Sequence, residues 1–193
     1  MTRILKAAGI AGIATPFTAF SCILAAIALW PHFNWTSNAL SDLGVQWGLT
    51  ATLFDGGLVV SGLLCMVFAL GLWFFSSTKL LGKLATCLFF LACVAIVAIG
   101  VFNETFSPTH YVVSVMLFVM MPVSLLVFVG AFWLEGKHKL SVFTLATGLA
   151  AAFPWLLQFT IHYVPNVAIP EFVSVLVVAP WAIELSILML KSA

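Results

Sequence analysis

Six long apolar runs alternate with short polar segments along the chain. A helix rises about 1.5 Å per residue, so about 20 apolar residues cross the hydrocarbon core of a bilayer. Runs of sufficient length lie near residues 7–30, 49–75, 83–102, 109–134, 141–163 and 171–190. The connecting segments are short, which favours antiparallel neighbours. The pattern predicts an all-α polytopic membrane protein, a compact bundle of six transmembrane helices in a single transmembrane domain, residues 1–193.

The composition supports this fold class. Hydrophobic residues make up 64% of the chain and charged residues 7%, whereas soluble domains carry roughly 45–50% apolar and 25% charged residues. The net charge of +1 does not provide the basic surface that nucleic acid requires. We therefore expect membrane lipids, and as a further option other membrane subunits, as partners, and no nucleic acid.

The first apolar run resembles a secretory signal peptide in two respects. Arg3 and Lys6 precede it, and Ala26-Ile27-Ala28 imitates a cleavage site. Signal peptides have an apolar region of about 7–15 residues, and the run over 7–30 is longer. We expect it to be retained as a membrane helix.

The basic residues predict an orientation. All seven occur in four places: Arg3 and Lys6, Lys79 and Lys83, Lys137 and Lys139, and Lys191. Six crossings place these four segments on one side, which the positive-inside rule assigns to the cytoplasm. We therefore expect a protein of the cell membrane with both termini cytoplasmic. The opposite, outer side has acidic residues instead.

The connection between the first two spans has the most varied side-chain chemistry of the chain. Residues 31–44 combine aromatic and polar side chains. Thr36 or Ser37 could cap a short interfacial helix that ends at Gly44. Its apolar side chains would point toward the bundle: Trp35, Leu40 and Leu43. The segment would either plug the outer end or supply a hydroxyl and a carboxylate to a site.

Other polar residues fall at the same level. Gln158 lies one helical turn before His162 and would share its face. Together with residues of the first connection, they predict a polar pocket in the outer half of the bundle. We call the residues of this pocket the candidate outer polar cluster: Asn38, Ser41, Asp42, Asp55, Glu104, His110, Gln158 and His162.

Asp55 lies inside the second span, roughly 9 Å below its outer boundary. A carboxylate there costs about 2.5–3.5 kcal/mol on insertion scales. We expect it to be protonated, hydrogen-bonded to Thr52 or Gln158, or close to His162. Alternatively, a thinner bilayer or the first connection leaves the Asp55 carboxylate in contact with water.

His110 lies near the start of the fourth span. Ser107 could cap that helix with Pro108 in its first position, and Pro170-Glu171 would open the sixth span in the same way. A neutral His110 ring could accept a proton or bind a metal. Alternatively, it forms a hydrogen bond with Glu104 or a loop carbonyl.

Small residues and cysteines have structural interpretations. Pairs of small residues four apart, such as Ala8 with Gly12 and Gly57 with Ser61, let helices approach closely in lipid. The four cysteines all lie in apolar runs, with no CxxC pair, so we expect them to pack as small hydrophobes. No motif assigns a metal or a cofactor.

Residues 35–44 (WTSNALSDLG), 102–104 (FNE) and 108–111 (PTHY) resemble the domain of unknown function 998 family of archaeal and bacterial multi-pass membrane proteins. Ser-Asp-Leu-Gly is also loosely similar to a segment of the DRAM/Frag-like six-span family. The first resemblance implies a polytopic membrane protein without an established activity. It also implies that Asn38, Ser41, Asp42 and His110 belong to a shared motif.

These observations leave several functions open. The leading hypothesis is an integral membrane protein that binds a lipid or small molecule, or that serves as an accessory membrane subunit. A second is a membrane-embedded lipid hydrolase, since Asp42, Glu104, His110 and His162 are ligand types that zinc takes, although no HExxH motif is present. Two others are haem b ligation by His110 and His162, and transport, which only Asp55 and Glu184 support.

Overall fold

The computed structural model describes residues 1–76 and 80–193, so Lys79 lies outside the described residues. Six helices, each long and apolar enough to cross a membrane, make up most of the chain. They are α1 (Thr2–Leu29), α2 (Leu49–Phe75), α3 (Leu80–Val101), α4 (Thr109–Leu134), α5 (His138–Ile161) and α6 (Ala168–Lys191). Two short 3₁₀ helices, η1 (Ser41–Val45) and η2 (Glu104–Phe106), lie in the connections. The described residues include no strand, and the predicted all-α, six-helix fold is confirmed.

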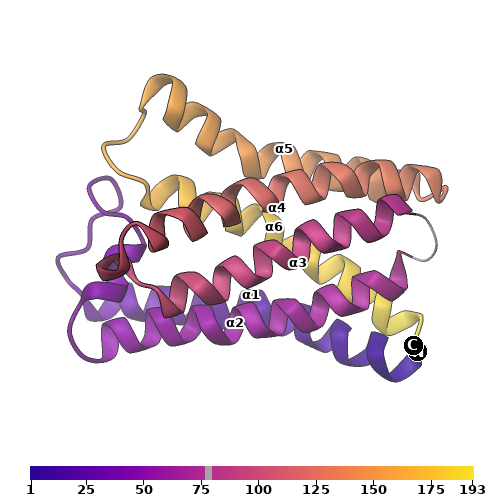
Figure 1. Ribbon diagram of the computed structural model, residues 1–193, viewed down its shortest axis with the longest axis horizontal. Helices are drawn as coiled ribbons and strands as arrows, with labels where there is room; N and C mark the ends of the chain where they lie inside the picture. The colour runs from indigo at the N-terminus through magenta and orange to yellow at the C-terminus, as the bar shows by residue number, and fades with distance from the viewer. Residues whose placement is uncertain (77–79) are drawn as a thin grey trace.

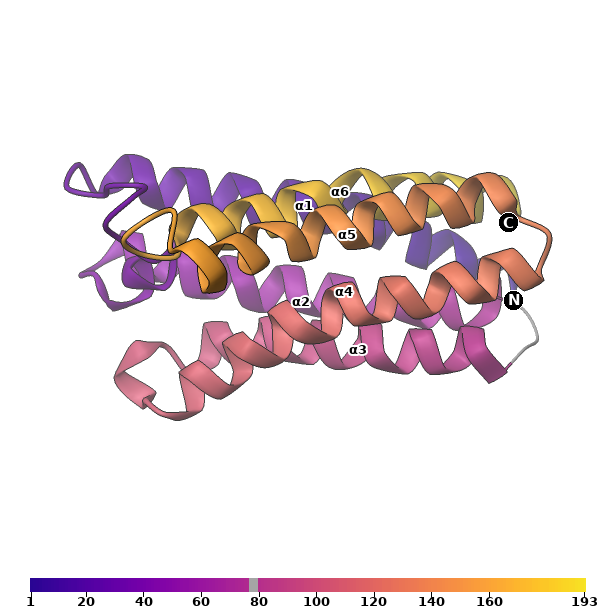
Figure 2. The ribbon, with the colours of Figure 1, turned by 90° about the horizontal axis from the view of Figure 1, so that it is seen from above.

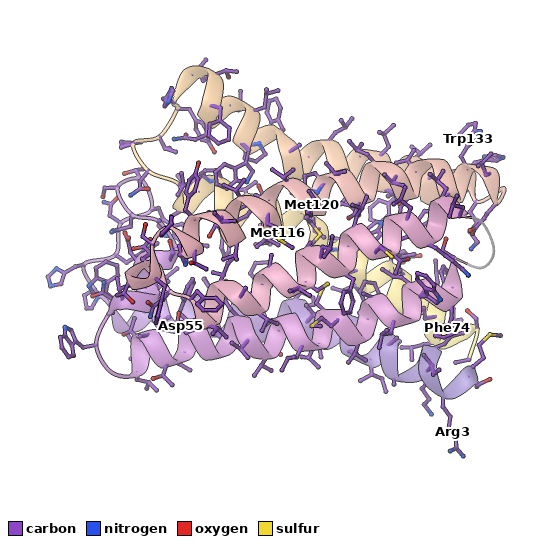
Figure 3. All side chains as sticks on the ribbon, in the orientation of Figure 1. Arg3, Asp55, Phe74, Met116, Met120 and Trp133 are labelled. Atoms are coloured by element: carbon purple, nitrogen blue, oxygen red, sulfur yellow. The ribbon has the colours of Figure 1, made fainter. Side chains whose placement is uncertain are left out.

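The helices run side by side and form a ring in chain order (Figures 1 and 2). Each packs against the next in the chain, and α6 closes the ring against α1. Both chain termini lie at the same end of the bundle (Figure 2). We call this the basic end, and the opposite end, which has η1 and η2, the capped end. Figure 3 places Arg3 and Trp133 at the basic end and Asp55 toward the capped end.

Aromatic side chains fill the middle of the ring. Trp181 of α6 is fully buried, and its ring centroid lies 6.2 Å from Phe68, 5.6 Å from Phe89 and 5.7 Å from Phe128. Its indole Nε1 donates to Thr144 Oγ1 at 2.9 Å, which satisfies a polar group that would be costly to bury alone. Side chains from α2, α3, α4, α5 and α6 therefore meet at one point.

Small residues allow close contact around α1. A Cβ atom at Gly57 of α2 would overlap the side chain of Cys22 on α1. One at Gly12 of α1 would overlap Phe68 of α2 and Ser186 of α6. In lipid, such close approach of backbones supplies much of the packing energy between helices.

The predicted cap of one helix and the predicted start of another are wrong. Helix α4 begins at Thr109, as its predicted span does, but Pro108 rather than Ser107 is its N-cap, and no side chain caps it. Helix α6 begins at Ala168, two residues before Pro170. Proline is tolerated there, since the N–H groups of a first helical turn have no partner within the helix.

The first connection also differs from the short interfacial helix predicted for it. Asn34, rather than Thr36 or Ser37, organises the turn: its Oδ1 accepts the backbone N–H groups of Thr36 at 2.9 Å and Ser37 at 3.2 Å. The helical part is only the 3₁₀ turn η1, which continues to Val45 beyond Gly44. The amide side chain of Asn34 therefore forms the turn, in place of the predicted hydroxyl cap by Thr36 or Ser37.

Candidate functional site

Three connections and the start of α6 are hydrogen-bonded together at the capped end, and we call this assembly the polar cap. Ser41 Oγ donates to Glu104 Oε1 at 2.6 Å, which joins η1 to η2. The backbone N–H of Leu40 donates to Glu171 Oε2 of α6 at 2.7 Å. Ala168 N donates to the carbonyl of Asn38 at 3.0 Å, and Asn166 N to that of Thr36 at 3.0 Å. The first connection is thus fastened to both of the other connections.

Asp42 stabilises the cap from within. Its Oδ2 accepts from Asn38 Nδ2 at 2.6 Å and from the backbone N–H of Ala39 at 3.1 Å. Its carbonyl accepts from Gln46 Nε2 at 2.8 Å. With these bonds, Asn38 and Asp42 fix the shape of the first connection.

Asp55 and His110 lie just beneath the cap. Asp55 Oδ2 accepts a long, 3.4 Å hydrogen bond from Asn103 Nδ2, which also donates to the carbonyl of Gly44 at 3.3 Å. Asp55 Oδ1 is buried without a hydrogen-bond partner. His110 is buried, and its Nδ1 lies 2.7 Å from the carbonyl of Phe102. A carbonyl only accepts, so Nδ1 is the donor, in agreement with the loop-carbonyl alternative.

The partners predicted for Asp55 are wrong. Thr52 Oγ1 donates to the carbonyl of Gly48 on its own helix at 3.0 Å. Gln158 Nε2 donates to the carbonyl of Val164 at 2.9 Å, so it fastens the end of α5 to the following connection. His162 is exposed and caps α5 in the left-handed region, with φ 47°. Gln158 and His162 therefore do not contribute to one pocket with Asp55.

The ligand sets considered for a metal and for haem are not assembled. Among residues 1–76 and 80–193, no three His, Cys, Asp or Glu side chains are grouped so that they could hold a metal ion. Asp42 is bonded within its own turn and Glu104 to Ser41. His110 is buried and His162 exposed, on different helices, and neither lines the cavity below the cap.

A cavity of about 140 Å³ lies beneath the polar cap, inside the ring. Its walls come from α1, α2, α3, α4 and α6 and are dominated by apolar side chains, among them Phe20, Phe54, Phe89, Phe118 and Met121. Of the candidate polar residues, only Ser41 lines it. The pocket in this half of the bundle is therefore apolar with a polar roof, rather than polar throughout.

Glu171 is the functional candidate that the sequence interpretation missed. It lines the cavity and is only 9% exposed. Oε2 accepts from Leu40 N, while Oε1 accepts no hydrogen bond from any residue that the structure describes. Its position in the sequence places it on the acidic outer side and at the start of the sixth span, but not in the candidate outer polar cluster. The signal that could have identified Glu171 is an acidic residue at the start of an apolar span, on the side of the bundle where the other acidic residues lie.

No described residue of α5 is among those that line the cavity. Both ribbon views show the capped end of α5 standing apart from that of α4 (Figures 1 and 2). A smaller hollow between α4, α5 and α6 shares Leu117, Phe118, Met121 and Val175 with the cavity wall. The cavity wall therefore comes from the other five helices and the first connection.

The six apolar helices define a multi-pass membrane protein. The chain matches the model of the family described as "Protein of unknown function (DUF998)" over residues 13–188, and it belongs to that family. No curated protein and no solved structure matches it. The likeness to the DRAM/Frag-like family receives no support from these comparisons.

Proposed function

We propose that this DUF998 protein binds the apolar part of a membrane amphiphile in the cavity beneath its polar cap. The apolar cavity is the observation that supports this proposal. Its volume of about 140 Å³ is close to the roughly 150 Å³ of an engineered apolar cavity that stays dry and binds benzene. Membrane lipids are the partners that we propose.

The cap and the aromatic cluster suit such a role. The cap's hydrogen bonds hold η1 over the cavity, and Phe89, which lines the cavity, is supported from behind by its contact with Trp181. An amphiphile would enter from the side toward α5, the helix that contributes no described residue to the wall. Its apolar part would then lie in the cavity while its head lies under the cap.

A cavity-filling substitution tests this proposal. Ala19 lines the cavity, whereas Ala28, on the same helix, is exposed. Wild type, Ala19→Phe and Ala28→Phe are purified in one detergent and compared by native mass spectrometry after addition of decanol. We expect wild type and Ala28→Phe to retain decanol and Ala19→Phe to lose it.

Equal retention by all three variants would mean that decanol binds elsewhere and would overturn the proposal. So would the absence of retained decanol in the wild type. Thermal unfolding of Ala19→Phe in the same detergent controls for a misfolded variant.

We also propose that the basic end faces the cytoplasm of a cell-membrane protein and that residues 1–193 form a single domain. The described Lys and Arg residues all belong to the basic end: Arg3, Lys6, Lys83, Lys137, Lys139 and Lys191. The positive-inside rule then orients the bundle, and closure of the ring by α6 against α1 supports one domain.

Labelling of single cysteines tests the orientation. In a cysteine-free background, Trp47→Cys reports on an almost fully exposed residue at the capped end, and Ser192→Cys reports on the basic end. We expect a membrane-impermeant maleimide to label Trp47→Cys in intact cells and Ser192→Cys only after lysis. The reverse pattern would contradict the orientation.

A further inference from the structure

We propose that Glu171 and Ser41 select the head group of the bound amphiphile, favouring a hydrogen-bond donor, either a hydroxyl or an ammonium group, over an anionic head. The inference rests on the proposed function, since it assigns the chemistry of the same cavity. It concerns the polar roof, whereas the proposed function concerns the apolar walls.

Glu171 presents an acceptor to the cavity. Its side chain is 9% exposed and lines the cavity. Only Oε2 has a protein donor, the Leu40 N–H at 2.7 Å, while Oε1 receives no hydrogen bond from a described residue. The protein therefore leaves Oε1 free to accept, and a ligand that donates to Oε1 would add a hydrogen bond that no described residue makes.

Ser41 also presents an acceptor. Its hydroxyl hydrogen is directed to Glu104 Oε1 at 2.6 Å, which leaves only the lone pairs of Oγ for a ligand. Two other hydroxyls of the wall are occupied within their own helices, since Thr15 donates to the carbonyl of Ala11 and Ser61 to that of Gly57. The Ser114 hydroxyl can both donate and accept, so it does not discriminate between heads.

The charges around the roof favour the same choice. Asp42 and Glu104 are the other acidic residues of the polar cap. No described lysine or arginine belongs to the capped end, since these residues lie in the segments of the basic end. A phosphate or carboxylate head would face acidic groups without a basic partner, whereas an ammonium group would be attracted.

Three amphiphiles with the same chain isolate the head group: decanol, decylamine and decanoate. Their affinities for the wild-type protein are measured by native mass spectrometry in one detergent at pH 9, where the Glu171 carboxyl group is ionised and decylamine is still an ammonium ion. We expect decanol and decylamine to bind at least about tenfold more tightly than decanoate, as the gain or loss of one charge-assisted hydrogen bond implies.

Glu171→Gln tests the assignment to Glu171. The amide oxygen can still accept from Leu40 N, while the amide NH₂ group then faces the cavity as a donor. We expect the affinity for decylamine to fall by about tenfold and the affinity for decanoate to rise, whereas the affinity for decanol should change less, because its hydroxyl can also accept from the amide. Glu184→Gln, at an exposed position on the same helix, should leave all three affinities unchanged.

The outcomes separate the two proposals. If all three compounds bind wild type equally and Ala19→Phe abolishes their binding, the cavity is a binding site and the head-group inference is overturned. If Glu171→Gln leaves the order of affinities unchanged, Glu171 does not select the head. If no compound binds the wild type, both proposals fail.

Discussion

Ser41 donates its hydroxyl hydrogen to Oε1 of Glu104 across 2.6 Å, although 63 positions separate the two residues. This bond joins the α1–α2 connection to the α3–α4 connection. The neighbouring Leu40 N–H is bonded to Glu171 of α6. One short segment therefore connects helix ends on opposite parts of the ring, and it also forms the roof of the cavity.

A double-mutant cycle measures the Ser41–Glu104 bond. A hydrogen bond to a charged group contributes about 1.5–3 kcal/mol, so we predict a coupling energy in the lower part of that range for Ser41→Ala and Glu104→Ala. The free energies of unfolding are obtained by denaturant titration in detergent. Ser21→Ala, at an exposed position of α1, serves as a control. Additivity of the two substitutions within about 0.5 kcal/mol would show that the bond does not stabilise the cap.

Adjacent glycines on α2 test the contact with α1. A Cβ atom at Gly57 would overlap Cys22 of α1, whereas one at Gly56 meets nothing within 4 Å. We predict that Gly57→Ala lowers the free energy of unfolding by about 1–3 kcal/mol, as overpacking does. Gly56→Ala should leave stability unchanged or raise it by up to about 1 kcal/mol, because alanine favours helix. Equal effects in thermal unfolding would contradict the close α1–α2 contact.

The fold was predictable because a bilayer imposes one length scale and one polarity on each span. The runs of apolar residues correspond to helices α1 to α6, with errors of a few residues at their ends. The partners of polar side chains were not predictable in the same way. Leu40 and Glu171 are 131 positions apart, and no periodicity relates them.

Asp55 illustrates the same limit. The choice of Thr52 and Gln158 as partners followed helix periodicity and expected depth. However, Asn103, on the connection after α3, reaches Asp55 beneath Gly44. Only the packing of α3 beside α2 creates that contact. Asn103 belongs to the segments that resemble the family, but that resemblance does not indicate its hydrogen-bond partners.

Substitution of Asp55 measures the cost of its poorly satisfied carboxylate. Oδ1 is buried without a partner, and the bond to Oδ2 is 3.4 Å long. Because a charged group within the membrane is costly, we predict that Asp55→Asn is at least as stable as the wild type in thermal unfolding. A loss of stability with Asp55→Asn, matched by Asn103→Ala, would instead mean that the Asp55–Asn103 bond stabilises the cap.

Trp181 is predicted to be the most sensitive aromatic residue of the bundle. It is fully buried, packs against Phe68, Phe89 and Phe128, and donates to Thr144 Oγ1. Trp181→Phe removes that bond and leaves a void, so the free energy of unfolding should fall by about 1–3 kcal/mol.

Trp133 provides the matched control for that substitution, because its side chain is 55% exposed at the basic end of α4. Trp133→Phe should change the stability by less than about 0.5 kcal/mol, as surface substitutions usually do. The two variants are compared by denaturant unfolding in the same detergent. Similar losses for both would mean that the aromatic cluster does not hold the ring together.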